Sequence, residues 1–219
     1  MNRRTISIFI LICAAATFSF AQTRQISANE FYTSSYNAQK LMNERSSRMV
    51  TKTDTMENGA TVKSISKIYE RLLPDRERFV TTEKIGDKET RSEYIRIGYM
   101  EYRRENNEPW TSKDLRGSGN GSGGGSGSVS CAQFTEEIVT IDGTAARKLR
   151  QYMVERTPEG LSYDDMTSWF DQNSGLLLKS ERFKGLLEPR VEKSQSVTTY
   201  EYDPNIKIEA PIKEAAAKP

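Results

Sequence analysis

The chain has 219 residues, a formal net charge of +2 and no histidine. Without histidine, Ser-His-Asp and Cys-His catalysis, most catalytic zinc sites and any histidine pH switch are excluded. The near-neutral charge gives no electrostatic support for nucleic-acid binding. An enzyme of this composition would have to work through carboxylates, lysine or tyrosine.

The first 21 residues are typical of a secretory signal peptide. Two arginines precede a mostly apolar stretch over residues 6–20, and Ser19 and Ala21 are the small residues that signal peptidase needs before Gln22. No later segment approaches the ~20 apolar residues of a transmembrane helix. We therefore expect cleavage after Ala21, a periplasmic location and no stable transmembrane anchoring.

The two cysteines bear on processing and on stability. Lipid attachment at Cys13 is the alternative to a plain signal peptide, but the small residue that a lipoprotein signal places before its cysteine is missing, since Ile12 stands there. Cys131 is the only cysteine outside the signal, so an internal disulfide is excluded. We expect Cys131 to be a semi-buried small residue.

One helix is predicted near the start of the exported domain. Ser27 and Glu30 have the spacing of a capping box, and apolar residues from Phe31 to Met42 recur at intervals near 3.6. This pattern predicts an amphipathic helix over residues 27–43. Serines in its middle weaken its intrinsic helicity, so we expect it to be ordered by docking on a larger element.

From Ser47 onward, β-favouring stretches alternate with turn signals such as Asn58-Gly59 and Asp142-Gly143. About ten strands are predicted, and their short connections imply antiparallel pairing. In the stretch 94–99, alternation places Ile95, Ile97 and Tyr99 on one face and Arg96 on the other. A sheet with one apolar face must be covered or closed, so it should curl around the helix. We expect one α+β domain, mainly β, over residues 22–212, followed by a frayed tail at 213–219.

The segment 117–128 contains seven of the chain's fourteen glycines. We interpret it as a disordered insertion within a hairpin, because such a run cannot pack. It matches the spacing G-x-G-x-x-G, but it lacks the strand and the helix that a dinucleotide site requires. No cofactor is therefore predicted.

Two further motifs have catalytic spacing. Ser64 and Lys67 fit the serine–lysine spacing of penicillin-binding enzymes, but on a strand their side chains face opposite ways. The same geometry separates adjacent acids such as Asp164 and Asp165, and Glu136 and Glu137. We expect these acids to solvate exposed faces.

A third motif, at residues 171–175, begins like a calcium loop. Its glycine occupies a ligand position and no acid stands at the twelfth residue, so it predicts a hairpin turn without metal.

The segment 168–181 resembles the tryptophan–aspartate hairpin of the outer-membrane lipoprotein carrier (LolA-like) superfamily. Trp169-Phe170-Asp171 is followed by a turn through Gly175, and the chain returns as Leu176-Leu177-Leu178-Lys179. Residues 200–211 are similar to the closing strand of that superfamily and to the proline that ends it. The resemblance implies a curved antiparallel sheet, an incomplete barrel wrapped over helices, with an apolar cavity for acyl chains.

Members of this superfamily carry lipoproteins, bind glycolipids or sense envelope stress. Our leading hypothesis is therefore a non-enzymatic protein that binds a lipid acyl chain or a lipidated protein. The candidate cavity residues are Ile95, Ile97, Tyr99, Trp169 and Leu178. The alternative is a sensor or interaction domain with a filled core, which docks an envelope protein partner through an edge strand or a loop. A carboxylate-based hydrolase would need two acids brought together from distant strands.

Overall fold

The computed structural model describes residues 23–116, 131–202 and 205–212. The expectations for the signal peptide, the glycine–serine segment and the tail concern residues outside these ranges. Helix α1 spans Ala28–Asn43. The strands are β1 (Arg24–Gln25), β2 (Ser47–Glu57), β3 (Ala60–Leu72), β4 (Arg76–Ile85), β5 (Lys88–Ile97), β6 (Met100–Glu105), β7 (Thr111–Asp114), β8 (Cys131–Ile141), β9 (Thr144–Thr157), β10 (Gly160–Asp171), β11 (Leu177–Leu187) and β12 (Arg190–Glu201).

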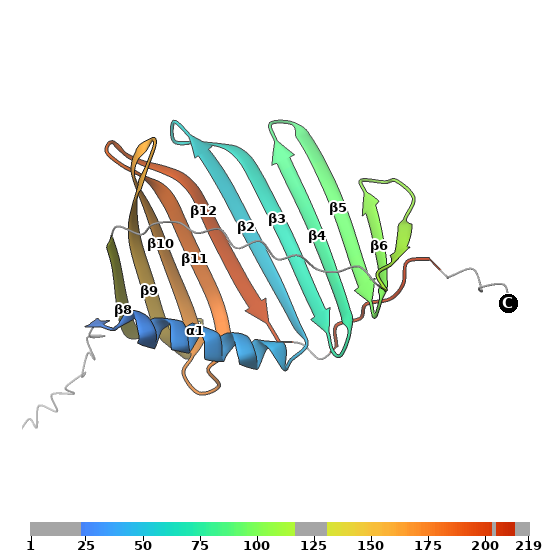
Figure 1. Cartoon of the computed structure of the whole chain (residues 1–219), viewed down its shortest axis with the longest axis horizontal. Coiled ribbons are helices and arrows are strands. Elements are labelled where there is room, and N and C mark those ends of the chain that lie inside the picture. Colours follow the sequence, from blue (N-terminus) through green and yellow to red (C-terminus); the bar gives the residue numbers. More distant parts are fainter. Residues whose placement is uncertain (1–22, 117–130, 203–204, 213–219) are drawn as a thin grey trace, which may run out of the picture.

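The twelve strands form a single antiparallel sheet in the order β1-β8-β9-β10-β11-β12-β2-β3-β4-β5-β6-β7. Two meanders, β2–β7 and β8–β12, meet where β12 pairs with β2. Figure 1 shows the open, curved sheet with α1 lying across one of its faces. The predicted α+β incomplete barrel is confirmed. The predicted strand count missed short elements such as the two-residue β1 and the four-residue β7.

The expected hairpin around the glycine–serine segment is wrong. Strands β7 and β8 follow each other in the chain, but they lie ten strand positions apart in the sheet and do not pair. The chain therefore returns from one side of the sheet to the other between Arg116 and Cys131. Sequence alone favoured a hairpin because most short connections join neighbouring strands.

The sequence signals for a tight turn and for the start of the helix are confirmed. Asn58 and Gly59 both have positive φ, at 52° and 77°, as a tight hairpin turn requires. The capping box of α1 is present: the Ser27 Oγ accepts from the Glu30 amide at 3.2 Å, and the Ser27 amide donates to Glu30 Oε2 at 2.8 Å. At the other end of the helix, Arg71 donates to the carbonyl of Met42.

We call the face on which α1 packs the inner face and the opposite face the outer face. On the inner face, Phe31 and Ala38 of α1 pack with Leu149 of β9 and Phe170 of β10. This first core orders the helix, as its weak intrinsic propensity required.

A second core lies on the outer face, over β5 and β6. The segment 205–209 covers it with Ile206 and Ile208, which pack with Ile95 and Tyr102. Arg76 donates to the Ile208 carbonyl at 2.8 Å and fixes the segment against β4. The sheet is thus covered on opposite faces at its two ends.

Candidate functional site

Three of the five predicted cavity residues lie at the β5–β6 hairpin. Ile95 is buried in the outer-face core, and the half-buried Ile97 packs against that core. Strand β5 ends at Ile97, and Gly98 turns the chain with φ 57°. Tyr99 therefore lies in a turn, where it is 68% exposed.

The other two lie on β10 and β11. Trp169 pairs opposite Lys179, whose ammonium nitrogen is 5.4 Å from the indole centroid. Leu178 is half-buried at the irregularity where the register shifts between Trp169 and Phe170. Four strands separate β11 from β5, roughly 24 Å at the usual strand spacing. The five residues do not form one pocket, and the ligand-binding role of each stays a prediction.

The structure instead forms a cleft between α1 and strands β10–β12, on the inner face. Its volume is about 290 Å³, close to the lower end of small-ligand pockets. The helix contributes side chains at helical spacing, and β10 contributes alternate residues, as the two periodicities require. The lining residues are Ser35, Ala38, Gln39, Met42, Met166, Ser168, Phe170, Leu177, Ser180 and Tyr200.

This cleft is apolar with a few neutral polar groups. Met42, Met166, Phe170 and Leu177 supply the apolar surface, and no acidic or basic side chain lines it. Burial raises the pKa of Tyr200, so its hydroxyl stays protonated at neutral pH. Such a cleft can bury an apolar chain.

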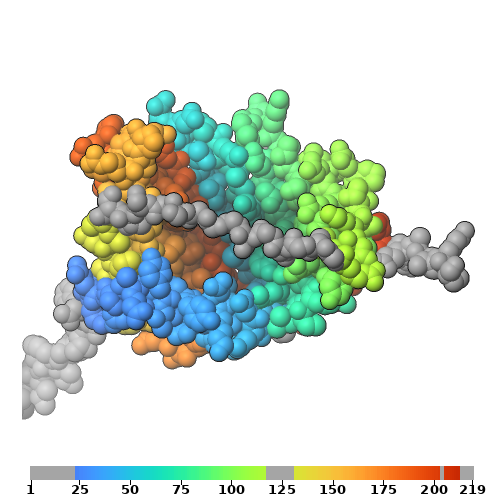
Figure 2. Space-filling model, viewed as in Figure 1, coloured from blue at the N-terminus to red at the C-terminus, as the bar shows by residue number. Residues whose placement is uncertain are grey.

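An apolar row continues from the cleft across the inner face. Cross-strand pairing places five side chains side by side on β12, β2, β3, β4 and β5: Tyr200, Met49, Tyr69, Phe79 and Tyr94. Ring centroids are 4.4 Å apart between Tyr69 and Phe79 and 5.6 Å apart between Phe79 and Tyr94. Phe79 is still 41% exposed. Figure 2 shows the molecule hollowed above α1, over these middle strands.

Sequence reasoning missed this row. Nothing in the sequence showed that Tyr200, Met49 and Tyr69 lie in register with Phe79 and Tyr94. On the inner face, the nearest side chains along the same strand are polar, and only the pairing of five strands aligns the row.

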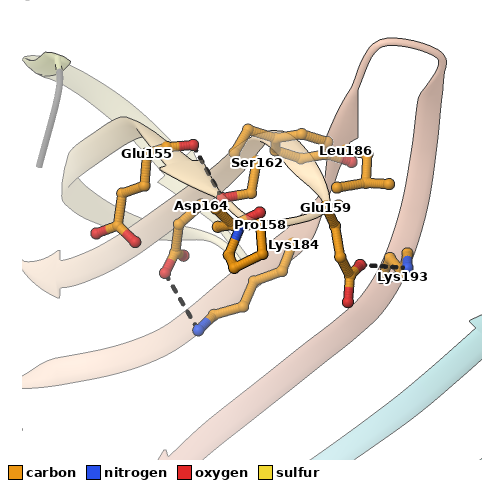
Figure 3. A pocket seen from close by; sticks show the side chains of 11 residues that line it. Glu155, Pro158, Glu159, Ser162, Asp164, Lys184, Leu186 and Lys193 are labelled. Carbon is orange, nitrogen blue, oxygen red and sulfur yellow. Dashed lines mark hydrogen bonds and ion pairs between the residues drawn. The ribbon is translucent and has the colours of Figure 1, made fainter. Parts of the chain in front are cut away.

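A second cavity, of about 330 Å³, lies at the rim between the β9–β10 and β11–β12 hairpins (Figure 3). Four of its five charged side chains are paired with one another: Lys184 with Asp164 at 3.3 Å and Lys193 with Glu159 at 3.0 Å. A ligand would have to compete with these ion pairs, so the apolar cleft is the better candidate site.

The motifs with catalytic spacing have structural roles. Ser64 donates to Asp54 at 2.6 Å, and Lys67 is on the opposite face of β3, as predicted. Asp164 pairs with Arg182 at 2.5 Å, whereas Asp165 pairs with Arg150 at 2.6 Å on the other face.

The second acid pair behaves in the same way. Glu136 pairs with Arg24 and Arg147, and Glu137 pairs with Lys148 at 2.9 Å. The acids are neutralised by partners from neighbouring strands rather than brought together.

The turn between β10 and β11 is the predicted hairpin. The Asp171 Oδ1 accepts from the amides of Asn173 and Ser174 at 3.1 and 2.6 Å. In the part of the chain that the structure describes, no group of three or more metal-ligating side chains occurs. Within the same ranges, α1 is neither long nor apolar enough to cross a membrane.

The expectation for Cys131 is wrong, because its side chain is exposed at the start of β8. It lies in the part of β8 that β1 does not cover, since β1 pairs only with Thr135 and Glu136.

The fold and the cleft together define a curved half-barrel with one helix on its inner face. No family model and no curated protein matches the chain. Among solved structures, it is similar to the crystal structure of LprF from Mycobacterium bovis, with 13% sequence identity and a TM-score of 0.47 over 85% of this chain and 99% of that one. A likeness at this level carries no information about a ligand.

Proposed function

We propose that this protein is an exported, periplasmic binding protein without enzymatic activity, which holds a lipid acyl chain or a lipidated protein between α1 and the inner face. The observation that carries the proposal is the apolar cleft beside Met42, Met166 and Leu177. Burying methylenes there would contribute ~0.8 kcal/mol each, before the cost of ordering the ligand. The resemblance of the β10–β11 hairpin to the lipoprotein carriers supports the same function.

The cleft can be tested by filling it. The Ser180 side chain lines the cleft, so Ser180→Phe should weaken binding of a fluorescent fatty acid at least tenfold while far-UV circular dichroism stays unchanged. Thr199 is exposed on the outer face of the adjoining strand, so Thr199→Phe is the matched control and should bind like wild type. Mass spectrometry of an organic extract of the purified protein should identify the natural ligand.

The second candidate function is an interaction or sensor domain for an envelope protein. Strand β7 favours it, because all four of its residues are exposed at an open edge of the sheet. A wild-type protein that binds no acyl probe and yields no lipid on extraction would contradict the lipid proposal. The interaction or sensor domain would then be the better account.

Export makes a separate prediction about the mature chain. The small residues Ser19 and Ala21 should direct cleavage, so intact-mass measurement of protein from the periplasm should give a chain that begins at Gln22. An acylated chain that begins at Cys13 would show a lipoprotein instead.

A further inference from the structure

The apolar row ends beside three cationic side chains on the inner face, Arg96, Arg103 and Lys113. Arg103 of β6 pairs in register with Tyr94, and its guanidinium carbon lies 5.3 Å from the Tyr94 ring centroid. A cavity of about 590 Å³ opens beyond this point, next to β7. Arg96, Arg103 and Lys113 line it against a single acid, Glu101.

These cations keep donors that face solvent. The Arg103 Nε contacts Glu101 Oε1 at 2.5 Å, but the Arg103 side chain stays 65% exposed. Arg96 pairs with Glu77 at 2.9 Å. The side chain of Lys113 is on the same face, since Lys113 pairs in register with Glu101. With Glu77 counted, three cations face two acids, so the site keeps an excess of one positive charge, which attracts an anion.

The row is only one residue wide. Polar side chains flank it on both sides, one pleat away, which is roughly 7 Å along the strands. The flanking residues are Thr51, Lys67, Thr81 and Ser92 on one side and Arg71, Glu77 and Arg96 on the other. A strip of this width accommodates one extended hydrocarbon chain rather than several.

The row is also continuous with the cleft, because Tyr200 belongs to both. From Tyr200 on β12 to Arg103 on β6 there are five strand spacings, roughly 24 Å. That span suits a long acyl chain.

We propose that the ligand is a single-chain amphiphile with an anionic headgroup, whose chain lies along the apolar row with its end in the cleft and whose headgroup contacts Arg103 and Lys113. This inference rests on the proposed function and names the class of its ligand. It excludes cationic amphiphiles and lipids whose several chains must be buried together.

Three amphiphiles with the same sixteen-carbon chain test the headgroup: palmitate, monopalmitoylglycerol and hexadecyltrimethylammonium. Calorimetric titration of the full exported chain, below the critical micelle concentrations, should show one palmitate bound per chain. Palmitate should bind at least tenfold more tightly than monopalmitoylglycerol, and the cationic amphiphile should bind most weakly. Added salt should reduce the advantage of palmitate.

The double variant Arg103→Gln, Lys113→Gln should bind palmitate no more tightly than monopalmitoylglycerol, whose affinity should not change. Arg150→Gln is the control, since Arg150 pairs with Asp165 on the outer face. Equal binding of all three amphiphiles to wild type would overturn this inference and leave the acyl-binding function standing. Binding of none of them would overturn both. If the double variant fails to fold, the comparison of the three amphiphiles on wild type decides alone.

Discussion

On the outer face, buried carboxylates are held by arginines from neighbouring strands. Glu93 is 5% exposed and contacts Arg104 at 2.6 Å, Arg91 at 3.1 Å and Arg78 at 3.4 Å. Burial by itself raises the pKa of Glu93, but these arginines outweigh it and hold the pKa below the usual 4.5. The carboxylate therefore stays charged in the folded protein at any pH near neutral.

The variant Glu93→Gln should lower the free energy of unfolding at pH 7 by about 2 kcal/mol, because three arginines lose their shared partner. A lowered folded-state pKa adds stability above the ordinary value of 4.5, and this stability is lost as pH falls through the lower folded value. Urea unfolding of wild type and variant between pH 7 and 3 should therefore show the difference shrinking with acid. Glu83→Gln, in a half-exposed pair with Lys63, is the control and should cost less than 1 kcal/mol. A difference that does not change with pH would contradict this account of Glu93.

At the scale of single residues, the sequence predicted on which face of the sheet an acid lies, but not which arginine pairs with it. Alternation placed Asp164 and Asp165 on opposite faces, and the structure confirms it. Their pairing with Arg182 and Arg150 depends on the register of β10 with β11 and with β9. Alternation alone does not determine that register.

At the scale of elements, two short segments cover the sheet. Helix α1 covers one end of the inner face, and the segment 205–209 covers the outer face at β5 and β6. Neither is stable alone, since one is a helix of modest propensity and the other an extended strip with two buried isoleucines. Each is ordered by the apolar surface that it buries.

The packing of the segment 205–209 predicts the role of Ile95. Ile208→Ala and Ile95→Ala should each lower the free energy of unfolding by about 2–4 kcal/mol, because both side chains are buried in the same core. Acyl-probe binding should remain at the wild-type level in both variants, measured by fluorescence titration beside thermal unfolding. Ile85→Ala is the control, since Ile85 is 52% exposed. If Ile95→Ala weakens acyl binding and leaves stability unchanged, Ile95 lines the ligand cavity after all.

At the scale of the whole molecule, strand order makes the connection between β7 and β8 a structural requirement. These strands lie ten positions apart, roughly 48 Å along the curved sheet, and sixteen residues join Asp114 to Cys131. An extended chain covers at most ~3.3–3.6 Å per residue, so the number of residues in this connection limits the distance that it can span.

Replacing residues 117–128 with a four-residue turn should therefore disrupt the fold. About eight residues would remain between the strands, with a reach of at most roughly 28 Å. We expect a loss of several degrees in thermal midpoint or a dimer that exchanges β8–β12 between chains, measured by thermal unfolding and light scattering. A different glycine–serine sequence of unchanged length is the control. A monomeric short-turn variant with the wild-type midpoint would show that β7 and β8 are neighbours.

The sequence by itself determined what local rules control: the capping box and length of α1, the Asn58-Gly59 turn, antiparallel strands with alternating faces, and the absence of histidine chemistry. Only the tertiary structure decided which strands are neighbours, in which register, and what covers each face. Alternation showed that Ile95 and Ile97 share a face, yet the residues that bury that face, Ile206 and Ile208, come more than a hundred positions later. The pairing of distant segments depends on the total apolar surface that the fold buries. A short stretch of sequence does not determine that surface.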